Sequence, residues 1–156
     1  MKKLLVISIV ALCTVNGYAQ RGRASVGTRL GYAAEWETVT LGVDYRYRFL
    51  PEFRLAPSLT HMVRNRNMSA WYMDMDCHYI VTVTDMFSFY PIGGMNLSLW
   101  RQYLYGMTNT ARLGLNVGLG AELRLTREIS VSLDMKYNIT GRYDQALAAV
   151  RVAYHF

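Results

Sequence analysis

The stretch that decides the fold is residues 112–125, with the sequence RLGLNVGLGAELRL. Every second position from Leu113 to Leu125 is apolar, and the positions between them hold arginine, glycine, asparagine or glutamate. Successive side chains of a strand point to opposite faces, whereas a helix would mix the two sets around its surface. The stretch therefore predicts a β-strand with one apolar face and one polar face.

The same alternation occurs in seven further segments of the chain. They are residues 26–32, 39–49, 53–63, 71–83, 87–99, 129–139 and 146–156. Pro57 and Pro91 lie inside two of these segments, where each removes a backbone donor and indicates an edge or a bulge. The pattern predicts an all-β chain of eight antiparallel strands.

The expected connections between these strands alternate in length. Three are tight turns, around residues 50–52, 84–86 and 126–128, and four are longer loops, at residues 33–37, 65–69, 100–110 and 141–145. Short turns at one end and longer loops at the other are typical of an up-and-down membrane barrel. An even number of strands also places both termini at the turn end.

The composition agrees with a single ordered unit that is rich in strand. The chain has 156 residues, of which 52% are apolar and 18% charged, whereas an ordinary soluble domain has about 25% charged residues. No apolar run reaches the roughly 18 residues that a spanning helix needs. The formal net charge of +6 is spread along the chain without a basic run, so we expect no nucleic-acid partner.

Residues 1–19 have the pattern of a secretory signal peptide. Lys2 and Lys3 precede a nine-residue apolar segment, and Gly17 and Ala19 place small residues at the −3 and −1 positions of a cleavage site. Cleavage after Ala19 would leave a mature domain that spans residues 20–156.

The two cysteines add no covalent scaffold. Cys13 offers an alternative interpretation of the leader as a lipoprotein signal, but Leu12 is bulkier than the small residue which such a signal uses before its cysteine. Once Cys13 is removed, Cys77 is the one cysteine of the mature chain, so it has no partner for an internal disulfide or a cysteine metal site.

The alternation by itself fits both a membrane barrel and a soluble β-sandwich or lipocalin, which turn the apolar face in opposite directions. The predicted strands run for about ten residues, long enough to cross a bilayer at a tilt. The apolar rows carry charges only near their ends, at Glu37, Asp85 and Arg101, and a lysine or arginine at mid-bilayer would cost about 2–4 kcal/mol. Aromatic residues gather at strand ends, as they do at membrane interfaces. These features favour the transmembrane barrel.

The last segment adds a family feature, since Val150, Val152, Tyr154 and Phe156 alternate up to a terminal phenylalanine. In this respect the chain resembles the small outer-membrane β-barrel proteins of Gram-negative bacteria, similar to the OmpX-type and OmpA-type barrels with a porin-like domain. The resemblance covers residues 20–156 and implies an eight-stranded antiparallel up-and-down transmembrane β-barrel in the outer membrane. It also implies contact with outer-membrane lipid, and Tyr154 and Phe156 as the signal for the barrel assembly machinery. We expect a monomer.

An eight-stranded barrel has an interior just wide enough for its own side chains. The polar rows place these charged residues inside it: Asp44, Arg46, Arg48, Asp74, Asp76, Glu122, Arg124, Asp134, Lys136 and Arg151, with Arg29, Arg54, Arg64 and Arg112 as further members, some of them near the rims. Buried charges cost several kcal/mol each unless they pair. We therefore expect a structural ion-pair network that plugs the bore. Asp134 is expected beside Lys136, Arg124 and Arg151, with Gly118 and Gly120 leaving space for the side chains opposite them.

The most specific motif is Asp74-x-Asp76-x-His78, whose three side chains point the same way on a strand. Two carboxylates and an imidazole suit a metal ion, but one straight strand presents converging ligands poorly. We favour the alternative, in which they neutralise neighbouring arginines, and predict no metal and no cofactor. Ser58 and His61 would point to opposite faces of a strand, so no catalytic constellation is predicted either.

These observations lead us to expect a structural or surface-exposed protein of the cell envelope without catalysis. Two alternatives stay open, namely passive transport of small solutes across the outer membrane, and adhesion or partner binding through the extracellular loops. Trp100, Tyr103 and Tyr105 are the candidate loop contacts, because exposed aromatic residues favour interfaces. The same residues could instead extend an aromatic girdle into the lipid headgroups.

Overall fold

The computed structural model describes residues 24–65, 67–103, 108–141 and 144–156, and the expected signal peptide lies outside these residues. The strands are β1 (Ala24–Ala33), β2 (Thr38–Arg48), β3 (Phe53–Asn65), β4 (Met68–Tyr79), β5 (Val81–Thr82), β6 (Phe87–Gln102), β7 (Thr108–Arg124), β8 (Ile129–Ile139) and β9 (Gln145–His155). In the described part of the chain, no helix has the length and apolar character needed to cross a membrane.

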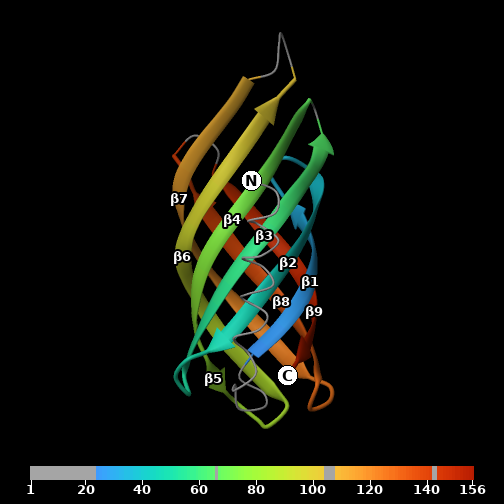
Figure 1. Cartoon of the computed structure of the whole chain (residues 1–156), viewed down its shortest axis with the longest axis vertical. Coiled ribbons are helices and arrows are strands. Elements are labelled where there is room, and N and C mark those ends of the chain that lie inside the picture. The colour runs from blue at the N-terminus through green and yellow to red at the C-terminus, as the bar shows by residue number, and fades with distance from the viewer. Residues whose placement is uncertain (1–23, 66, 104–107, 142–143) are drawn as a thin grey trace, which may run out of the picture.

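The strands form one closed antiparallel barrel, with all strands tilted against its long axis (Figure 1). Neighbours in the chain pair with one another, and the pairing of β1 with β9 closes the ring. β5 continues the line of β4 beyond Ile80 and pairs with the start of β6, so β4 and β5 together make one of eight strands. At this break the Ile80 N–H donates to the carbonyl of Glu52, at 2.6 Å. The predicted eight-stranded antiparallel barrel is confirmed, although the expected strand at residues 71–83 is interrupted once.

The connections fall into two groups at opposite ends of the barrel (Figure 1). The turns β2–β3, β5–β6 and β7–β8 lie at the end that we call the turn end, and the last residues of β1, β3, β6 and β8 lie at the opposite end, the loop end. The Phe156 N–H donates to the carbonyl of Ala24 at 3.1 Å, so both ends of the ring meet at the turn end, as predicted. At the loop end, β6 continues to Gln102 and β7 begins at Thr108, which shortens the loop expected at residues 100–110.

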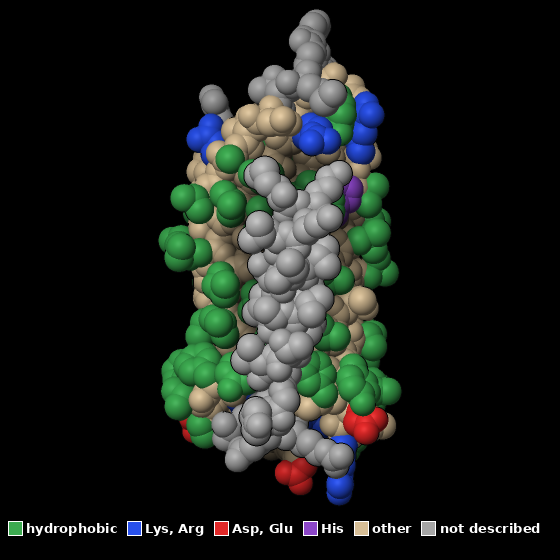
Figure 2. Space-filling view, in the orientation of Figure 1, with side chains coloured by type: hydrophobic (Ala, Val, Ile, Leu, Met, Phe, Trp, Pro, Cys, Tyr) green, Lys and Arg blue, Asp and Glu red, His purple; other side chains and the backbone are tan. Residues whose placement is uncertain are grey.

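The register separates the two faces of the wall as the alternation predicts. Leu119 on β7 pairs with Pro91 and Met135 on the flanking strands, and its side chain points outward with 63% exposure. The next residue, Gly120, pairs with Tyr90 and Asp134, which are both buried inside. Hydrophobic side chains cover the sides of the molecule in Figure 2, whereas charged ones gather toward its two ends. The apolar face is therefore the outer surface, and the buried face is polar.

Candidate functional site

Arg46 on β2 lies at the centre of the polar interior and is 1% exposed. Its guanidinium donates to Asp44 at 2.8 Å, to Asp134 at 2.6 Å and to the Tyr90 hydroxyl at 2.9 Å, and a longer contact of 3.4 Å reaches Glu122. These partners come from β2, β8, β6 and β7. One side chain thus connects strands on different sides of the bore.

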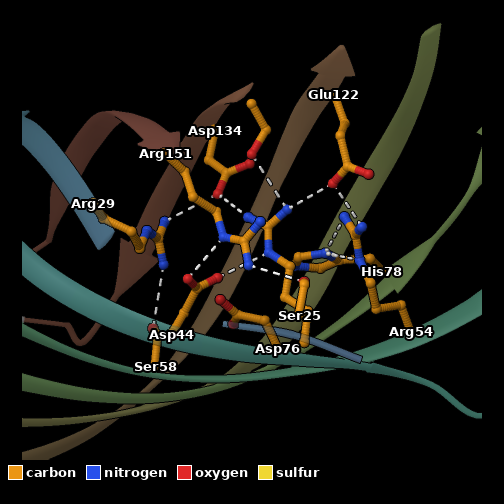
Figure 3. A network of polar contacts seen from close by, with 12 residues as sticks. Ser25, Arg29, Asp44, Arg54, Ser58, Asp76, His78, Glu122, Asp134 and Arg151 are labelled. Carbon is orange, nitrogen blue, oxygen red and sulfur yellow. Dashed lines mark hydrogen bonds and ion pairs between the residues drawn. The ribbon is translucent and has the colours of Figure 1, made fainter. Parts of the chain in front are cut away.

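Each of the three acids around Arg46 also pairs with a second arginine. Arg151 donates to Asp44 at 2.7 Å, Arg54 to Glu122 at 2.8 Å, and Arg29 to Asp134 at 3.2 Å. Figure 3 shows these arginines and carboxylates converging from several strands. We call the seven residues the central layer, and its members are Arg29, Arg46, Arg54, Arg151, Asp44, Glu122 and Asp134.

A second group, the loop-side layer, lies next to the central layer toward the loop end and consists of Lys136, Asp74, Asp76, Asn96 and Asn116. The Lys136 ammonium binds the carboxylates of both Asp74 and Asp76, the latter at 2.9 Å. Asn96 donates to Asp74 at 2.6 Å and Asn116 to Asp76 at 2.7 Å. Lys136 thus binds two carboxylates, and the two amides occupy further lone pairs of both.

The two layers balance one another in charge. The central layer holds four cations and three carboxylates, and the loop-side layer holds one cation and two carboxylates. Ser58 joins the layers, because it accepts from Arg29 at 3.2 Å and donates to Asp74 at 3.3 Å. The bore therefore carries five positive and five negative groups in contact, which is the arrangement that buried charges require.

The partners of Asp134 differ from those predicted. The sequence analysis placed it beside Lys136, Arg124 and Arg151, on the same strand or on its neighbours. Asp134 instead accepts from Arg29, from Arg46 and, at 2.5 Å, from the Tyr90 hydroxyl. The prediction was wrong because long side chains reach across a narrow bore, so partners are chosen by height in the barrel and not by adjacency along the wall.

Two of the arginines in the predicted bore set, Arg48 and Arg124, are only partly buried near the turn end. Arg64 was expected in the same set but is exposed. The register of β3 against β4 shifts between Met62 and Asn65, and such a bulge re-aims the side chains beside it. Arg64 therefore leaves the polar row that its position in the alternation assigns to it.

Gly120 and Gly118 leave room for these layers, as the sequence predicts. A Cβ atom at Gly120 would lie 2.5 Å from Cζ of Tyr90 and 2.8 Å from the Asp134 carboxylate. A Cβ atom at Gly118 would lie 2.8 Å from Cβ of Lys136. All three distances are shorter than van der Waals contact, so the glycines allow Tyr90 and Lys136 to occupy the bore.

The three side chains of the motif at residues 74–78 are buried in the bore and pair with residues of other strands. Asp74 and Asp76 bind Lys136, and His78 accepts from Arg54 at 3.3 Å while its ring stacks on Tyr90 at a centroid distance of 4.7 Å. The described residues contain no group of three or more histidine, cysteine or acidic side chains placed to hold a metal ion. Each member of the motif thus has a charged partner from another strand.

An apolar cluster follows the loop-side layer at the loop end of the interior. It consists of Ala33, Met62, Ala70, Tyr72, Trp100 and Leu147, with Trp36 and Met68 packed against it. The ring of Trp100 lies 5.3 Å from that of Trp36 and 5.8 Å from that of Tyr72, centroid to centroid. We call this group the apolar plug.

The prediction of Trp100 as a surface-loop contact is therefore wrong, since its side chain is 2% exposed. Trp100 continues the inward row of Asn96 and Ser98 on β6, and extending the alternation past Leu99 would have placed it inside. Tyr103 keeps partial exposure beyond the end of β6, with the Arg64 guanidinium 4.3 Å from its ring centroid. Tyr105 lies outside the described residues.

A closed antiparallel barrel with an apolar outer wall and a charge-filled bore defines a class, the transmembrane β-barrels. Residues 9–156 match the family model of the outer membrane protein beta-barrel domain, and the chain belongs to this family. Membership implies a location in the outer membrane. No curated protein matches the chain.

Solved structures of small barrels resemble most of the chain in fold. The N-terminal β-barrel domain of Pseudomonas aeruginosa OprF superposes with a TM-score of 0.75 at 13% identity, covering 88% of this chain and 100% of that one. Neisserial surface protein A superposes with a TM-score of 0.68 at 14% identity, covering 85% of this chain and 94% of that one. Ail, the attachment invasion locus protein of Yersinia pestis, superposes with a TM-score of 0.63 at 12% identity, covering 88% of this chain and 100% of that one. At such identities the likeness concerns the fold alone.

Proposed function

We propose that the protein is a closed, non-conducting barrel with a structural role in the outer membrane, carrying its loops to the cell surface without catalysing a reaction. The observation that carries this proposal is the placement of Arg46, which is buried at the centre of the bore and contacts residues of four strands. A solute on the barrel axis would have to displace this side chain and its partners.

The energetic barrier to such displacement is large. Removing one partner from a buried, hydrogen-bonded ion pair typically costs about 3–5 kcal/mol, and Arg46 alone holds two carboxylates within 2.8 Å. The loop-side layer and the apolar plug then form two further obstacles on the way to the loop end. The central layer and the loop-side layer together hold as many positive as negative groups, so the two layers carry no net charge that would attract an ion.

The absence of catalysis is supported by the state of the polar groups. In the described part of the bore, the closest match to a nucleophile with a base is Ser130, whose hydroxyl lies 2.8 Å from Nε2 of His155. Both side chains are buried inside the turn end, so a substrate has no access to the Ser130 hydroxyl. Ser58 is held by Arg29 and Asp74, while Ser25 and Ser132 accept hydrogen bonds from Arg151 and Arg46.

Single-channel recording in planar lipid bilayers tests the closed bore. We expect the purified protein to insert without conductance steps, and a triple variant Arg46→Ala/Lys136→Ala/Trp100→Ala to leak, because it shortens one long side chain in each of the three obstacles. Leu119→Ala on the outer wall serves as the matched control and should stay silent. Regular conductance steps from the wild-type protein would refute the proposal and support passive transport.

We further propose that Tyr154 and Phe156 carry the signal for the barrel assembly machinery, as the family resemblance implies. Both side chains point outward at the turn end, where a partner can reach them during biogenesis. Phe156→Ala should lower the amount of protein in the outer-membrane fraction, whereas refolding of the same purified variant into detergent should be unaffected. An equal loss in both measurements would indicate a purely structural role for Phe156.

A further inference from the structure

A hollow of about 390 Å³ lies on the outer wall near the loop end, across β3, β4, β6 and β7. The pairing places His61, Trp71, Leu99 and Ala111 in one row across these four strands. The next row toward the loop end holds Ser69, Arg101 and Asn109. The hollow exists because Ser69 and Ala111 are small while the side chains around them are large.

The upper rim of the hollow is cationic. Arg101 lines it directly and is exposed. Tyr103 lines it as well, and the Arg64 guanidinium stacks on that ring at 4.3 Å from the centroid, where the bulge in β3 has turned it outward. Among the described residues, neither arginine forms an ion pair with an acidic side chain. Basic side chains are visible at the loop end in Figure 2.

The lower rim of the hollow is apolar and continuous with the lipid-facing wall. The Trp71 side chain borders it, with the His61 ring packed against it at a centroid distance of 4.5 Å. The next outward row toward mid-membrane consists of Met73, Leu97 and Leu113. Two residues along a strand span roughly 6.6 Å, so cationic and hydrocarbon surfaces lie within the length of one lipid.

We propose that this hollow is a binding site for a phosphorylated lipid of the outer leaflet, with its phosphate on Arg64 and Arg101 and its acyl chain along Leu99 and Leu97. The guanidinium fork matches the oxygens of a phosphate and holds them with charge-assisted hydrogen bonds. Aromatic side chains such as Trp71 mark the depth at which headgroups begin, so the two arginines lie at the height of the phosphates. Trp100 of the apolar plug also lines the hollow, so the site adjoins the closed bore from the outside of the wall.

Native mass spectrometry of the detergent-solubilised protein, titrated with diphosphoryl lipid A, tests this site. We expect the double variant Arg64→Gln/Arg101→Gln to bind diphosphoryl lipid A about fivefold more weakly than the wild type, because it loses two exposed ion pairs with the phosphates. Arg127→Gln, an exposed arginine at the turn end, is the matched control and should bind like the wild type. Heat-dependent gel migration checks that each variant is folded.

Two further titrations identify what is bound. Fully dephosphorylated lipid A should bind more weakly to the wild type and equally to wild type and double variant, because the arginines then have no anion to hold. Inorganic phosphate should not compete with the lipid, since it lacks the acyl chain. Equal binding of diphosphoryl lipid A by the wild type and the double variant would overturn the proposal. Competition by inorganic phosphate would also overturn it, because it would show that the arginines bind a free anion and not a lipid.

Discussion

Asp134→Ala is the substitution that most directly probes the charge-filled bore. The Asp134 carboxylate is 1% exposed and accepts from Arg46 at 2.6 Å, Tyr90 at 2.5 Å and Arg29 at 3.2 Å. Its removal leaves Arg29 with the Ser58 hydroxyl as its remaining partner within the described residues. Since a buried cation without its partner typically costs about 3–5 kcal/mol, we expect a loss of that size in the free energy of unfolding.

The neighbouring residue, Leu133, is the matched control, because it lies on the outer wall with 42% exposure. Leu133→Ala removes apolar surface that moves from water into lipid on folding, at about 0.8 kcal/mol per methylene, or about 2 kcal/mol in all. No cavity term is added, because lipid chains fill the space. Asp134→Asn, which keeps the shape but not the charge, should fall between Asp134→Ala and the wild type.

Urea unfolding in liposomes, followed by tryptophan fluorescence and by heat-dependent gel migration, measures all three variants. The reasoning requires that Asp134→Ala be the most damaging of them. If Leu133→Ala proves worse, the outer face packs against protein and not lipid, and the assignment of inside and outside is refuted.

Three further predictions concern packing and orientation. Gly120→Ala should destabilise the barrel by about 1–3 kcal/mol, because the added methyl group is overpacked against Tyr90. Gly93→Ala should be nearly neutral, since a Cβ atom there meets nothing within 4 Å. Equal urea midpoints for the two variants would contradict the close packing at Gly120. In a Cys77→Ser background, a fluorophore on Leu123→Cys should be quenched by a lipid-soluble quencher, whereas one on the adjacent, partly buried Arg124→Cys should not. Quenching of both would invalidate the register. Trp100→Ala should lower the free energy of unfolding by about 3 kcal/mol or more, as truncations of buried aromatic side chains do. Tyr103→Ala should change it by less than about 1 kcal/mol. A larger loss for Tyr103→Ala than for Trp100→Ala would contradict the burial of Trp100.

The faces of the strands were predictable from residues alone. In a strand the side-chain period is two, so the alternation at residues 112–125 already assigns Leu119 to one face and Glu122 to the other, whatever the rest of the chain does. The tight turns were predictable for the same local reason, since the alternation stops at each of them. The direction of the apolar face followed from strand length and from the scarcity of charge on that face, both properties of the sequence.

The partners inside the bore were decided by the tertiary structure. Which charges meet depends on the tilt and stagger of eight strands, and these set the height of each side chain on the opposite wall. Asp134 therefore meets Arg29 and Arg46 and not Lys136, which is two residues away on its own strand. Long side chains widen the choice further, because they cross the bore.

At the loop end, too, local sequence determines some features and tertiary structure decides others. The alternation determines that Asn96 and Ser98 point inward, but only pairing with β4 and β7 continues β6 far enough to bring Trp100 into the apolar plug. Likewise, a bulge between Met62 and Asn65 turns Arg64 toward Tyr103, although period two assigns it to the bore. Local sequence determines on which side of a regular strand a residue lies, because that follows from backbone geometry. Where a strand ends or shifts its register is decided by its neighbours, because their hydrogen bonds are what extend or interrupt it.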